Sequence, residues 1–403
     1  MNILIVHTYY YPDIKGGAEY SVKKIAEGLA KRGYNVYVLC DCKDGNKDEL
    51  INGVHVLRRK MNCMRKSNNA FTNVLRAIME FYNPLNRPIV EKEFQMIGES
   101  GTICYTNSLR RISRVVWVVA DKRKIPLIDT QREYRMLRLL PEGSWLNKIW
   151  MQLNKEASQK VSVAAFISQT SKNAHLDEGF YPKAQHKVIY NSIDFDCERV
   201  RLIVEKRKHS AKSGENFKYV YLGSLEKHKG VDVLLEAFML LSKEIEGIEL
   251  HVAGQGNMEK NVLESALICP GIVYHGWLSE AEVSELLIDC NALVCPSVWK
   301  EPFGRVVLDA YKHGMPAIVA NSGGLAETVI HEKTGYVLTP GDPQELYKYM
   351  RRLAQNPDEY ISMCEAAYEV LPVYSLETQL DKFEHLFMEL LNRGNSGEEN
   401  EDN

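Results

Sequence analysis

Apolar residues follow two different spacings at the start of the chain. Residues 2–7 form an almost unbroken apolar run, which is typical of a parallel strand that is buried on both faces. Positions 22, 25, 26, 29 and 30 are then apolar, a spacing that places them on one face of a helix. Gly33 ends this predicted helix, and a second apolar run covers residues 35–39. The order strand, helix, strand predicts a βαβ unit with parallel strands.

The same alternation continues and then starts again in the second half of the chain. Two successive runs predict an α/β protein with two doubly wound, Rossmann-like domains. In such domains ligands bind outside the carboxyl ends of the strands. The further predicted strands are residues 103–106, 126–128, 163–167 and 188–190 in the first run, and residues 219–223, 249–253, 272–275, 292–295 and 317–320 in the second.

Breaks in this alternation predict the domain boundaries. We expect an N-terminal domain over residues 1–195 and a C-terminal domain over residues 215–375. The charged stretch 198–214 has little apolar pattern at its end and is interpreted as a linker. A helix over residues 376–393 is expected to pack back on the N-terminal domain, followed by an acidic, flexible tail over residues 394–403.

Composition places the chain among ordinary globular proteins. With 403 residues, 45% of them apolar and 26% charged, it is long enough for two domains and is neither disordered nor fibrous. The net charge of −3 excludes a polycation built for nucleic acid. Residues 1–200 carry 31 Lys and Arg against 21 Asp and Glu (+10), and residues 201–403 carry 19 against 32 (−13). This asymmetry indicates that one half meets an anionic surface or ligand.

Cysteine usage and hydropathy bear on the compartment. The nine cysteines are scattered and include no C-x-x-C pair, so we expect reduced thiols in a cytoplasmic protein. The apolar start of the chain lacks the basic flank and the cleavage site of a signal peptide. No apolar stretch approaches the ~18 residues of a membrane span. Any contact with a membrane is therefore expected to be peripheral.

Glycine-rich turns follow several of the predicted strands. Gly16 and Gly17 precede the first helix, where backbone N–H groups can bind an anion; the alternative is a flexible turn. The turn 223–230 adds two lysines before another helix, and its alternative is a solvated basic turn. Gly254-x-Gly256 is a weaker signal of the same kind. No G-x-G-x-x-G occurs, so a dinucleotide-binding oxidoreductase is not supported.

Residues 296–311 hold the densest set of candidate functional groups. A predicted strand ends there, a loop carries Trp299, Glu301 and Phe303, and a helix begins near Gly304. A carboxylate beside the backbone N–H groups of a helix start can bind hydroxyls and a phosphate together. Asp309 lies about two turns further along.

Glu301-Pro-Phe-Gly, followed by Asp309, resembles the signature of retaining glycosyltransferases of family 4. That family has the GT-B fold, in which two doubly wound Rossmann-like domains face each other across a deep cleft. The resemblance covers nearly the whole chain. The other segments that resemble the family are Pro12…Gly16-Gly17-Ala-Glu19, Tyr190-Asn-Ser-Ile-Asp194, Lys229-Gly230, Gly254-Gln-Gly256 and Gly323-Gly324-Leu-x-Glu327.

The resemblance implies a nucleotide-sugar donor, a UDP- or GDP-sugar, as co-substrate, with no metal and no other cofactor. It implies that the C-terminal domain binds the nucleotide sugar and that the N-terminal domain is the acceptor side. It assigns Lys229 to the donor diphosphate and Glu301 to the hydroxyls of the transferred sugar, close to the reacting carbon. A lysine and helix dipoles would stabilise the negative charge on the departing diphosphate. The other implied donor contacts are Gly16 and Gly17 for phosphate and acceptor, Ser224 and Gly254 in the strand-to-helix turns, Trp277 and Leu278 for the base, Phe303, Gly304, Arg305 and Val306 through backbone groups, and Asp309 for the ribose.

Three positions depart from the family pattern. Ser224 stands where the family usually has arginine, and Asp309 stands where it usually has glutamate. Arg132 aligns with a position that often carries histidine in the family. Because arginine stays protonated, Arg132 cannot act as a base, and we expect it to supply the cation that is missing at Ser224.

The resemblance predicts a hexosyltransferase-type enzyme that moves a sugar to a glycan or lipid-linked acceptor in bacterial surface polysaccharide synthesis. The alternative is a catalytically impaired sugar-nucleotide-binding or scaffold protein of the same fold, for which the three departures argue. The positive charge of the N-terminal half predicts that this half contacts the anionic inner face of the cell membrane. The candidate contacts are Arg58-Arg59-Lys60, Arg65-Lys66 and Lys122-Arg123-Lys124. The alternative is that these residues are solvated and that the acceptor is soluble, with no membrane role.

Two further features carry weaker functional interpretations. Asp194-x-Asp196 resembles the metal-binding pair of another glycosyltransferase fold, but it falls in the predicted turn between the domains. His7 ends the first strand, where a structural histidine is the more frequent case.

Overall fold

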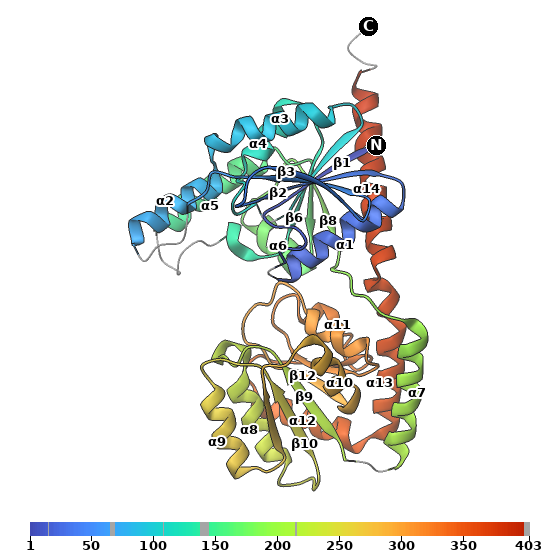
Figure 1. Cartoon of the computed structure of the whole chain (residues 1–403). Helices are drawn as coiled ribbons and strands as arrows, with labels where there is room; N and C mark the ends of the chain where they lie inside the picture. The colour runs from blue at the N-terminus through green and yellow to red at the C-terminus, as the bar shows by residue number, and fades with distance from the viewer. Residues whose placement is uncertain (15, 65–68, 108, 138–144, 214–215, 399–403) are drawn as a thin grey trace. The chain divides into compact units, whose positions relative to one another are not determined.

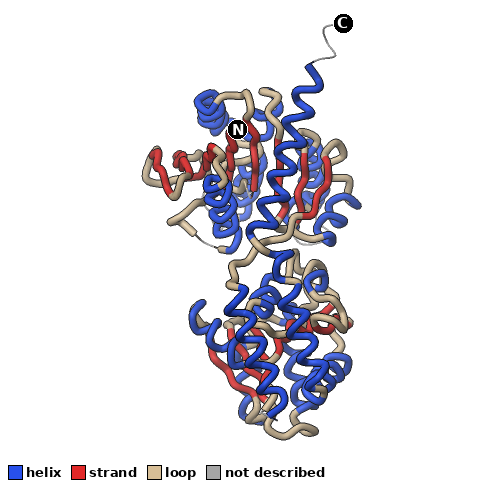
Figure 2. Tube along the Cα trace, turned by 90° about the vertical axis from the view of Figure 1, so that its right-hand side faces the viewer, coloured by secondary structure: helices blue, strands red, loops and turns tan. Residues whose placement is uncertain are grey.

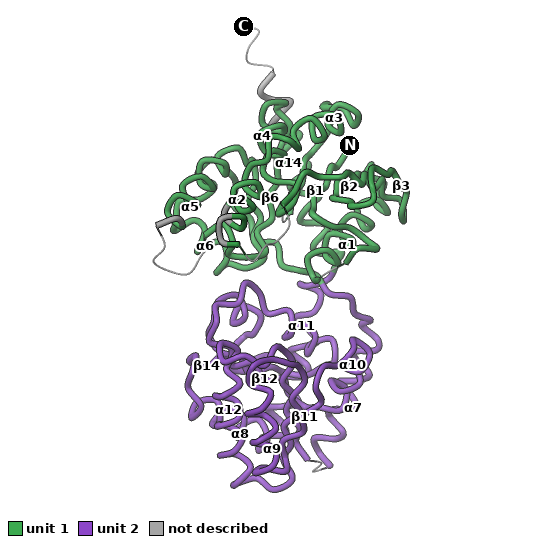
Figure 3. The backbone as a smooth tube through the Cα atoms, turned by 60° about the vertical axis from the view of Figure 1, so that its left-hand side comes forward, with its two compact units in different colours: residues 1–192, 376–403 green, residues 193–375 purple. Residues whose placement is uncertain are grey.

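The computed structural model describes the whole chain except residues 15, 65–68, 108, 138–144, 214–215 and 399–403 (Figure 1). The chain forms two compact units (Figure 3). Unit 1 contains Met1–Ser192 together with the segment that begins at Leu376, and unit 2 contains Ile193–Ser375. Figure 2 shows that helices cover the strands of each unit. The two α/β units expected from the sequence are thereby present.

Unit 1 is built on an eight-stranded sheet in the order β3-β4-β2-β1-β5-β6-β7-β8. All neighbouring strands are parallel except β3 and β4, which are antiparallel. The strands are β1 (Asn2–His7), β2 (Asn35–Asp41), β3 (Lys47–Ile51), β4 (Val54–Arg59), β5 (Thr102–Asn107), β6 (Leu127–Gln131), β7 (Val163–Phe166) and β8 (Gln185–Val188).

Both faces of this sheet are buried, as the apolar run of β1 predicts. Ile3 and Ile5 pack into a core with α1 (Gly17–Lys31) and α14 (Leu376–Glu398). Leu4 and Val6 point to the opposite face and pack with α3 and α4. The other helices of unit 1 are α2 (Ala70–Phe81), η1 (Pro84–Asn86), α3 (Arg87–Ile97), α4 (Val115–Lys122), η2 (Tyr134–Met136), α5 (Trp145–Ser158) and α6 (Gln169–Asp177).

Helix α14 returns from the end of the chain to pack against α1. The guanidinium of Arg32 pairs with Glu377, Asp381 and Glu384 of α14. The helix continues to Glu398, so the flexible tail expected over residues 394–403 is helical over its first part. Residues 399–403 lie outside the described residues.

Unit 2 is built on a six-stranded parallel sheet in the order β11-β10-β9-β12-β13-β14. Its strands are β9 (Lys218–Leu222), β10 (Glu249–Ala253), β11 (Ile272–Gly276), β12 (Ala292–Cys295), β13 (Ala317–Ala320) and β14 (Gly335–Leu338). Its helices are α7 (Cys197–Ser213), η3 (Lys227–Lys229), α8 (Val231–Leu241), α9 (Glu259–Ile268), α10 (Glu280–Asp289), α11 (Arg305–Tyr311), η4 (Ala326–Thr328), α12 (Pro343–Gln355), α13 (Pro357–Glu369) and η5 (Leu371–Tyr374).

The structure corrects several sequence-based expectations. The stretch interpreted as a linker is helix α7, which is anchored by the buried guanidinium of Arg207. Arg207 donates hydrogen bonds to the carbonyls of His313, Cys290 and Leu287. These bonds attach the helix to the rest of unit 2 through a charged side chain, which an apolar pattern does not reveal. The strand expected over residues 188–190 lies three residues earlier, because Gln185 pairs with Val163. Strands β3, β4 and β14 were not predicted.

None of the helices in the described part of the chain combines the length and the apolar character that a membrane crossing requires.

Candidate functional site

The strand order of unit 2 reverses between β9 and β12. From β9 the chain proceeds outward to β10 and β11, whereas from β12 it proceeds in the other direction to β13 and β14. β9 and β12 are direct neighbours, with Tyr219 opposite Ala292 and Val220 opposite Leu293. Loops that leave the carboxyl ends of such a strand pair diverge and form the usual ligand crevice of doubly wound sheets.

Two predicted site residues meet at this point. Lys229 follows β9 and Glu301 follows β12, and Lys229 Nζ lies 2.5 Å from Glu301 Oε1. The side chains are 25% and 17% exposed, so a ligand in the crevice can reach both. The buried Ser297 donates its hydroxyl hydrogen to the same Oε1 at 3.1 Å, a contact that the sequence did not suggest. The carboxylate is thereby held in one orientation.

Backbone contacts lock the two loops together. The His228 carbonyl accepts hydrogen bonds from the N–H groups of Val298 and Trp299, both at 3.1 Å. Gly230 has a left-handed backbone (φ 74°), and a Cβ at this position would lie 2.1 Å from the Pro296 carbonyl oxygen. A side chain at residue 230 would therefore push the Lys229 turn away from Glu301.

The loop after β13 holds the backbone of Glu301. The Glu301 N–H donates to the Ser322 carbonyl at 3.2 Å, and the Gly324 N–H donates to the Glu301 carbonyl at 2.7 Å. Gly323 has φ 69°, and a Cβ there would lie 2.5 Å from the Glu301 carbonyl oxygen. The Gly323-Gly324 pair is thus explained by the close approach of two backbones.

Further candidates line the strand ends on the other side of Lys229. Gly254 follows β10, and its N–H donates to the Gly276 carbonyl at 2.7 Å. A Cβ on Gly254 would lie 1.8 Å from the Gly223 carbonyl oxygen. After β11, Trp277 is 70% exposed and Leu278 is partly buried. The order of strands therefore lays Glu301, Lys229 and Trp277 out along one edge of the sheet, as an extended ligand requires.

The segment after Glu301 offers mainly backbone groups. The Phe303 ring is buried and contacts Tyr374, with ring centroids 6.4 Å apart. Gly304 is buried against Thr328, and Arg305 extends into solvent. Val306 is partly buried.

Two of the unusual positions have particular surroundings. The Asp309 carboxylate pairs with Lys312, the residue directly after α11, at 3.0 Å. Ser224 is exposed, and its carbonyl accepts the Tyr221 hydroxyl hydrogen at 2.8 Å. A ligand that uses Asp309 must therefore compete with Lys312.

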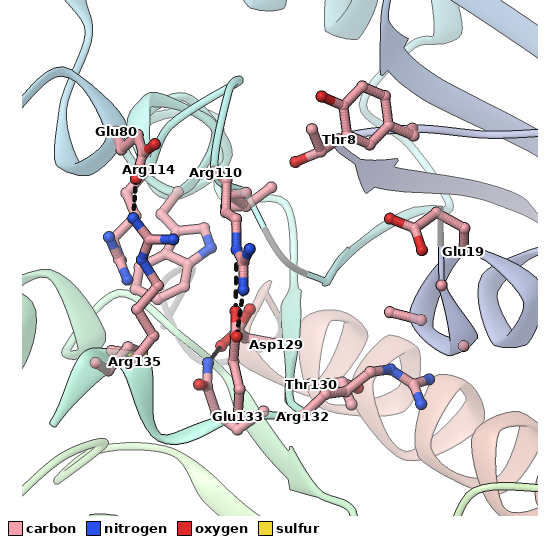
Figure 4. Close-up of a pocket in the computed structure, with 18 of the residues that line it drawn as sticks. Thr8, Glu19, Glu80, Arg110, Arg114, Asp129, Thr130, Arg132, Glu133 and Arg135 are labelled. Carbon is pink, nitrogen blue, oxygen red and sulfur yellow. Dashed lines mark hydrogen bonds and ion pairs between the residues drawn. The ribbon is translucent and has the colours of Figure 1, made fainter. Parts of the chain in front are cut away.

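Unit 1 contains its own cavity, of about 400 Å³, where the strand order reverses between β1 and β5 (Figure 4). Gly16 and Gly17 line it from the start of α1, and Arg132 lines it from the end of β6. The Nη1 atom of Arg132 donates to the Asn191 side-chain oxygen, and its buried Nε has no hydrogen-bond partner among the described residues. The expected role of Arg132 as a cation for the diphosphate stays a prediction.

A buried carboxylate forms the floor of this cavity. Asp129 accepts hydrogen bonds from Thr106, Gln131 and Tyr181 at 2.7, 2.5 and 2.8 Å. Burial raises the pKa of Asp129, and these hydrogen bonds oppose the increase. Asp129 was not predicted as a site residue, because the position of β6 beside the cavity depends on the strand order.

His7 is 1% exposed and contacts Glu19, with Nε2 to Oε1 at 3.7 Å. Its Nδ1 contacts the Asn107 carbonyl oxygen. The imidazole of His7 is the main cause that lowers the pKa of Glu19. These contacts connect the end of β1 to the first turn of α1, which is a structural role.

Two groups of expected charges have other partners. Arg58 and Arg59 are buried; Arg58 pairs with Glu49, and Arg59 pairs with Glu93. They are therefore not membrane contacts, whereas Lys122 and Lys124 are exposed. Arg65 and Lys66 lie outside the described residues.

The Asp-x-Asp pair also has a structural explanation. Asp196 Oδ1 accepts the Arg199 N–H at 3.1 Å and so caps the start of α7. Across the described residues, no group of three or more His, Cys, Asp or Glu side chains is arranged to hold a metal ion.

Comparison with known proteins decides the family. Residues 15–196 match the model of Glycosyltransferase Family 4, and residues 203–370 match the model of Glycosyl transferases group 1. The chain is a GT-B glycosyltransferase of the family 4 type. In this glycosyltransferase the two matched regions fall on the two Rossmann-like sheets described above.

The relatives of this glycosyltransferase have low sequence identity to it but match it over most of its length. An uncharacterised 42.6 kDa protein in the cps region of Klebsiella pneumoniae is 27% identical over 345 residues, which cover 81% of this chain and 87% of its own. Glycogen synthase of Mycobacterium tuberculosis is 27% identical over 383 residues, which cover 89% and 87%.

Solved structures share its fold. Anabaena HepE in complex with UDP has a TM-score of 0.67 at 20% identity, covering 96% of this chain and 100% of that chain. Sucrose-phosphate synthase of Thermosynechococcus elongatus has a TM-score of 0.72 at 17% identity, covering 97% and 99%.

Proposed function

We propose that this glycosyltransferase moves a sugar from a nucleotide-sugar donor to a glycan or lipid-linked acceptor, with retention of configuration and without a metal ion. The contact between Lys229 and Glu301 at the switch point of unit 2 carries the proposal. It joins a cation for phosphate to a carboxylate for sugar hydroxyls at the place where doubly wound sheets bind ligands.

The Lys229–Glu301 ion pair is the state of the site before the donor binds. A donor diphosphate takes Lys229 as its counter-charge, and Glu301 then accepts hydrogen bonds from the sugar hydroxyls. Ser297 keeps the carboxylate in place during this exchange. Each group thus passes from an internal partner to the ligand, and neither charge is left buried without a partner.

In the proposed reaction, the bond between the sugar's anomeric carbon and the phosphate oxygen breaks, and its electron pair stays on the diphosphate. Lys229 and the N-terminal N–H groups of α8 stabilise that charge. The acceptor hydroxyl attacks the oxocarbenium-like carbon from the face that the phosphate leaves. Its proton passes to the departing phosphate oxygen, so retention needs no additional base.

We propose a UDP- or GDP-sugar as donor, with the base near Trp277 and Leu278. The structures of HepE with UDP and with UDP-glucose support a UDP-sugar as the donor. Thermal-shift measurements with UDP, GDP, ADP and dTDP test the choice, because a ligand that binds the folded state raises the unfolding temperature. Equal shifts with all four nucleotides would contradict a specific donor base.

The relative in the Klebsiella cps region supports a role in surface polysaccharide synthesis. We propose that the enzyme works in the cytoplasm at the inner face of the cell membrane, with the basic half toward anionic lipid. Co-sedimentation with anionic and neutral vesicles tests this, since electrostatic binding weakens as salt rises. Equal sedimentation with both vesicle types would contradict it.

Product analysis tests the reaction itself. Incubation with a panel of nucleotide sugars and acceptors, followed by NMR of the product's anomeric carbon, should show a retained configuration, with activity that persists in EDTA. The competing proposal, a scaffold that binds sugar nucleotides, gains support from the Asp309–Lys312 pair. That protein would bind a nucleotide sugar and form no product.

A further inference from the structure

Arg114 and Arg135 lie near the Glu80 carboxylate at one end of the unit 1 cavity (Figure 4), and Arg76 approaches the same carboxylate from α2. Arg135 pairs with Glu80, and Arg76 lies 3.8 Å from the same carboxylate, one turn away on α2. Arg114, from the start of α4, completes the group. Arg114, Arg135 and Glu80 all line the cavity.

Arg114 lies among aromatic rings. Its guanidinium carbon is 5.4 Å from the ring centre of Phe81, 5.3 Å from that of Trp117 and 5.9 Å from that of Trp150. Its Nε is buried without a hydrogen-bond partner among the described residues. Burial lowers the pKa of Arg114, the Coulombic interactions with Tyr181, Asp129 and Glu80 raise it, and the positive charge of Arg135 lowers it. Arginine nevertheless stays protonated, so the site holds a partly buried cation that needs an acceptor.

Within the described residues, no nearby carboxylate accepts a hydrogen bond from the Nε of Arg114. Asp129 already accepts hydrogen bonds from Thr106, Gln131 and Tyr181. Glu133 is paired with Arg110 across the cavity. Among the described residues, the carboxylates of Glu80 and Asp129 thus face three arginines, and the inner end of the cavity carries excess positive charge.

We propose that Arg114 and Arg135 bind an anionic group, a carboxylate or a phosphate, on the acceptor sugar. The inference rests on the proposed function and on the N-terminal domain as the acceptor side, which the family resemblance implies. Guanidinium groups form paired hydrogen bonds with both anions. The apolar walls at Met136 and Trp150 suit the carbon face of a sugar ring. An acidic sugar or a sugar phosphate fits this combination, whereas a neutral hexose leaves the arginines unpaired.

Ligand-observed NMR with the full chain tests the proposal through three probes. Glucuronate carries a carboxylate, glucose 6-phosphate carries a phosphate, and methyl glucoside is neutral. At least one anionic probe should bind more tightly than methyl glucoside, and the better one identifies the group. If neither does, the proposal is wrong.

Variants connect the binding to the cluster. Arg135→Gln and Arg114→Met should each weaken the anionic probe by about tenfold or more, as expected for a lost charged hydrogen bond. Arg123→Gln is the matched control, because Arg123 pairs with Glu99 and does not line the cavity. If Arg114→Met fails to fold, the probe affinity of Arg135→Gln alone tests the proposal. An unchanged probe affinity in the folded variants would overturn the proposal.

Titration with UDP separates this inference from the proposed function. UDP affinity should be the same in wild type and Arg135→Gln. An equal loss for UDP and for the sugar probes would overturn the acceptor assignment, because the arginines would then serve the donor phosphates. Failure of the wild-type chain to bind any nucleotide sugar would instead contradict the proposed function, whatever the anionic probes show.

Discussion

Lys229 and Glu301 are 72 residues apart in the sequence, and their side chains form an ion pair at 2.5 Å across the switch point of the unit 2 sheet. The pair lies in the loops after β9 and β12, which are adjacent although three α-helices, the short helix η3 and two strands separate them along the chain. Its two members have different proposed ligands, the diphosphate and the sugar. Variants of each should therefore fail in different ways.

Replacing Glu301 should impair transfer and spare nucleotide binding. In Glu301→Ala the sugar hydroxyls lose their carboxylate near the reacting carbon, whereas the diphosphate keeps Lys229. We expect kcat to fall about 100-fold or more, with UDP affinity retained in calorimetric titration. Glu332→Ala, which removes an exposed carboxylate paired with Arg352, is the control. Wild-type turnover in Glu301→Ala would remove Glu301 from the site.

Replacing Lys229 should weaken the donor and the free nucleotide alike, because both carry the diphosphate. For Lys229→Ala we expect a loss of about 1.5–3 kcal/mol in the binding free energy of UDP, as for one charged hydrogen bond. Lys208→Ala is the matched control, since Lys208 pairs with Glu205 and Glu365 on the same unit. Calorimetry on the two variants measures the difference. Equal UDP affinities would contradict the assignment.

Gly323 should be needed for the position of Glu301. A Cβ in Gly323→Ala meets the Glu301 carbonyl oxygen at 2.5 Å and adopts a strained φ of 69°. We expect the free energy of unfolding to fall by about 1–3 kcal/mol and kcat/KM to fall with it. Gly33→Ala isolates the strain, because Gly33 has φ 88° with open space around its Cβ position. That control should lose stability and keep its activity in the folded state; equal activity losses in both variants would contradict the prediction.

Glu19 should make folding stability sensitive to acid. His7 lowers the pKa of Glu19 in the folded state, so the folded protein favours the ionised carboxylate. The resulting stabilisation is complete above the ordinary pKa of 4.5 and is lost as the pH falls through the lower folded value. Urea unfolding of Glu19→Gln should therefore show a weaker acid dependence than wild type. Glu280→Gln, a change at an exposed residue, serves as the control, and parallel acid curves for wild type and Glu19→Gln would count against this linkage.

Local sequence determined the elements and the family of this protein. The apolar run of β1 and the helical spacing of α1 predicted both elements, because strand and helix periods are properties of neighbouring residues. The Glu301-Pro-Phe-Gly segment and the glycine turns indicated the family, which the two matched family models confirm. Helix α7 was not predicted because its buried face consists of Val200, Val204 and the charged Arg207, and only the folded chain brings three carbonyls to that arginine.

The tertiary structure decided which charges are available to a ligand. Arg58 and Arg59 resemble a basic surface patch in the sequence, but strand β4 buries them against Glu49 and Glu93. Arg114 and Arg135 lie in separate segments with no shared motif, and the fold brings them together with the Glu80 end of α2. The spacing of charged residues along the sequence does not reveal which residue each of them pairs with. The pairing depends on strand order and helix packing, which contacts between residues distant in sequence establish.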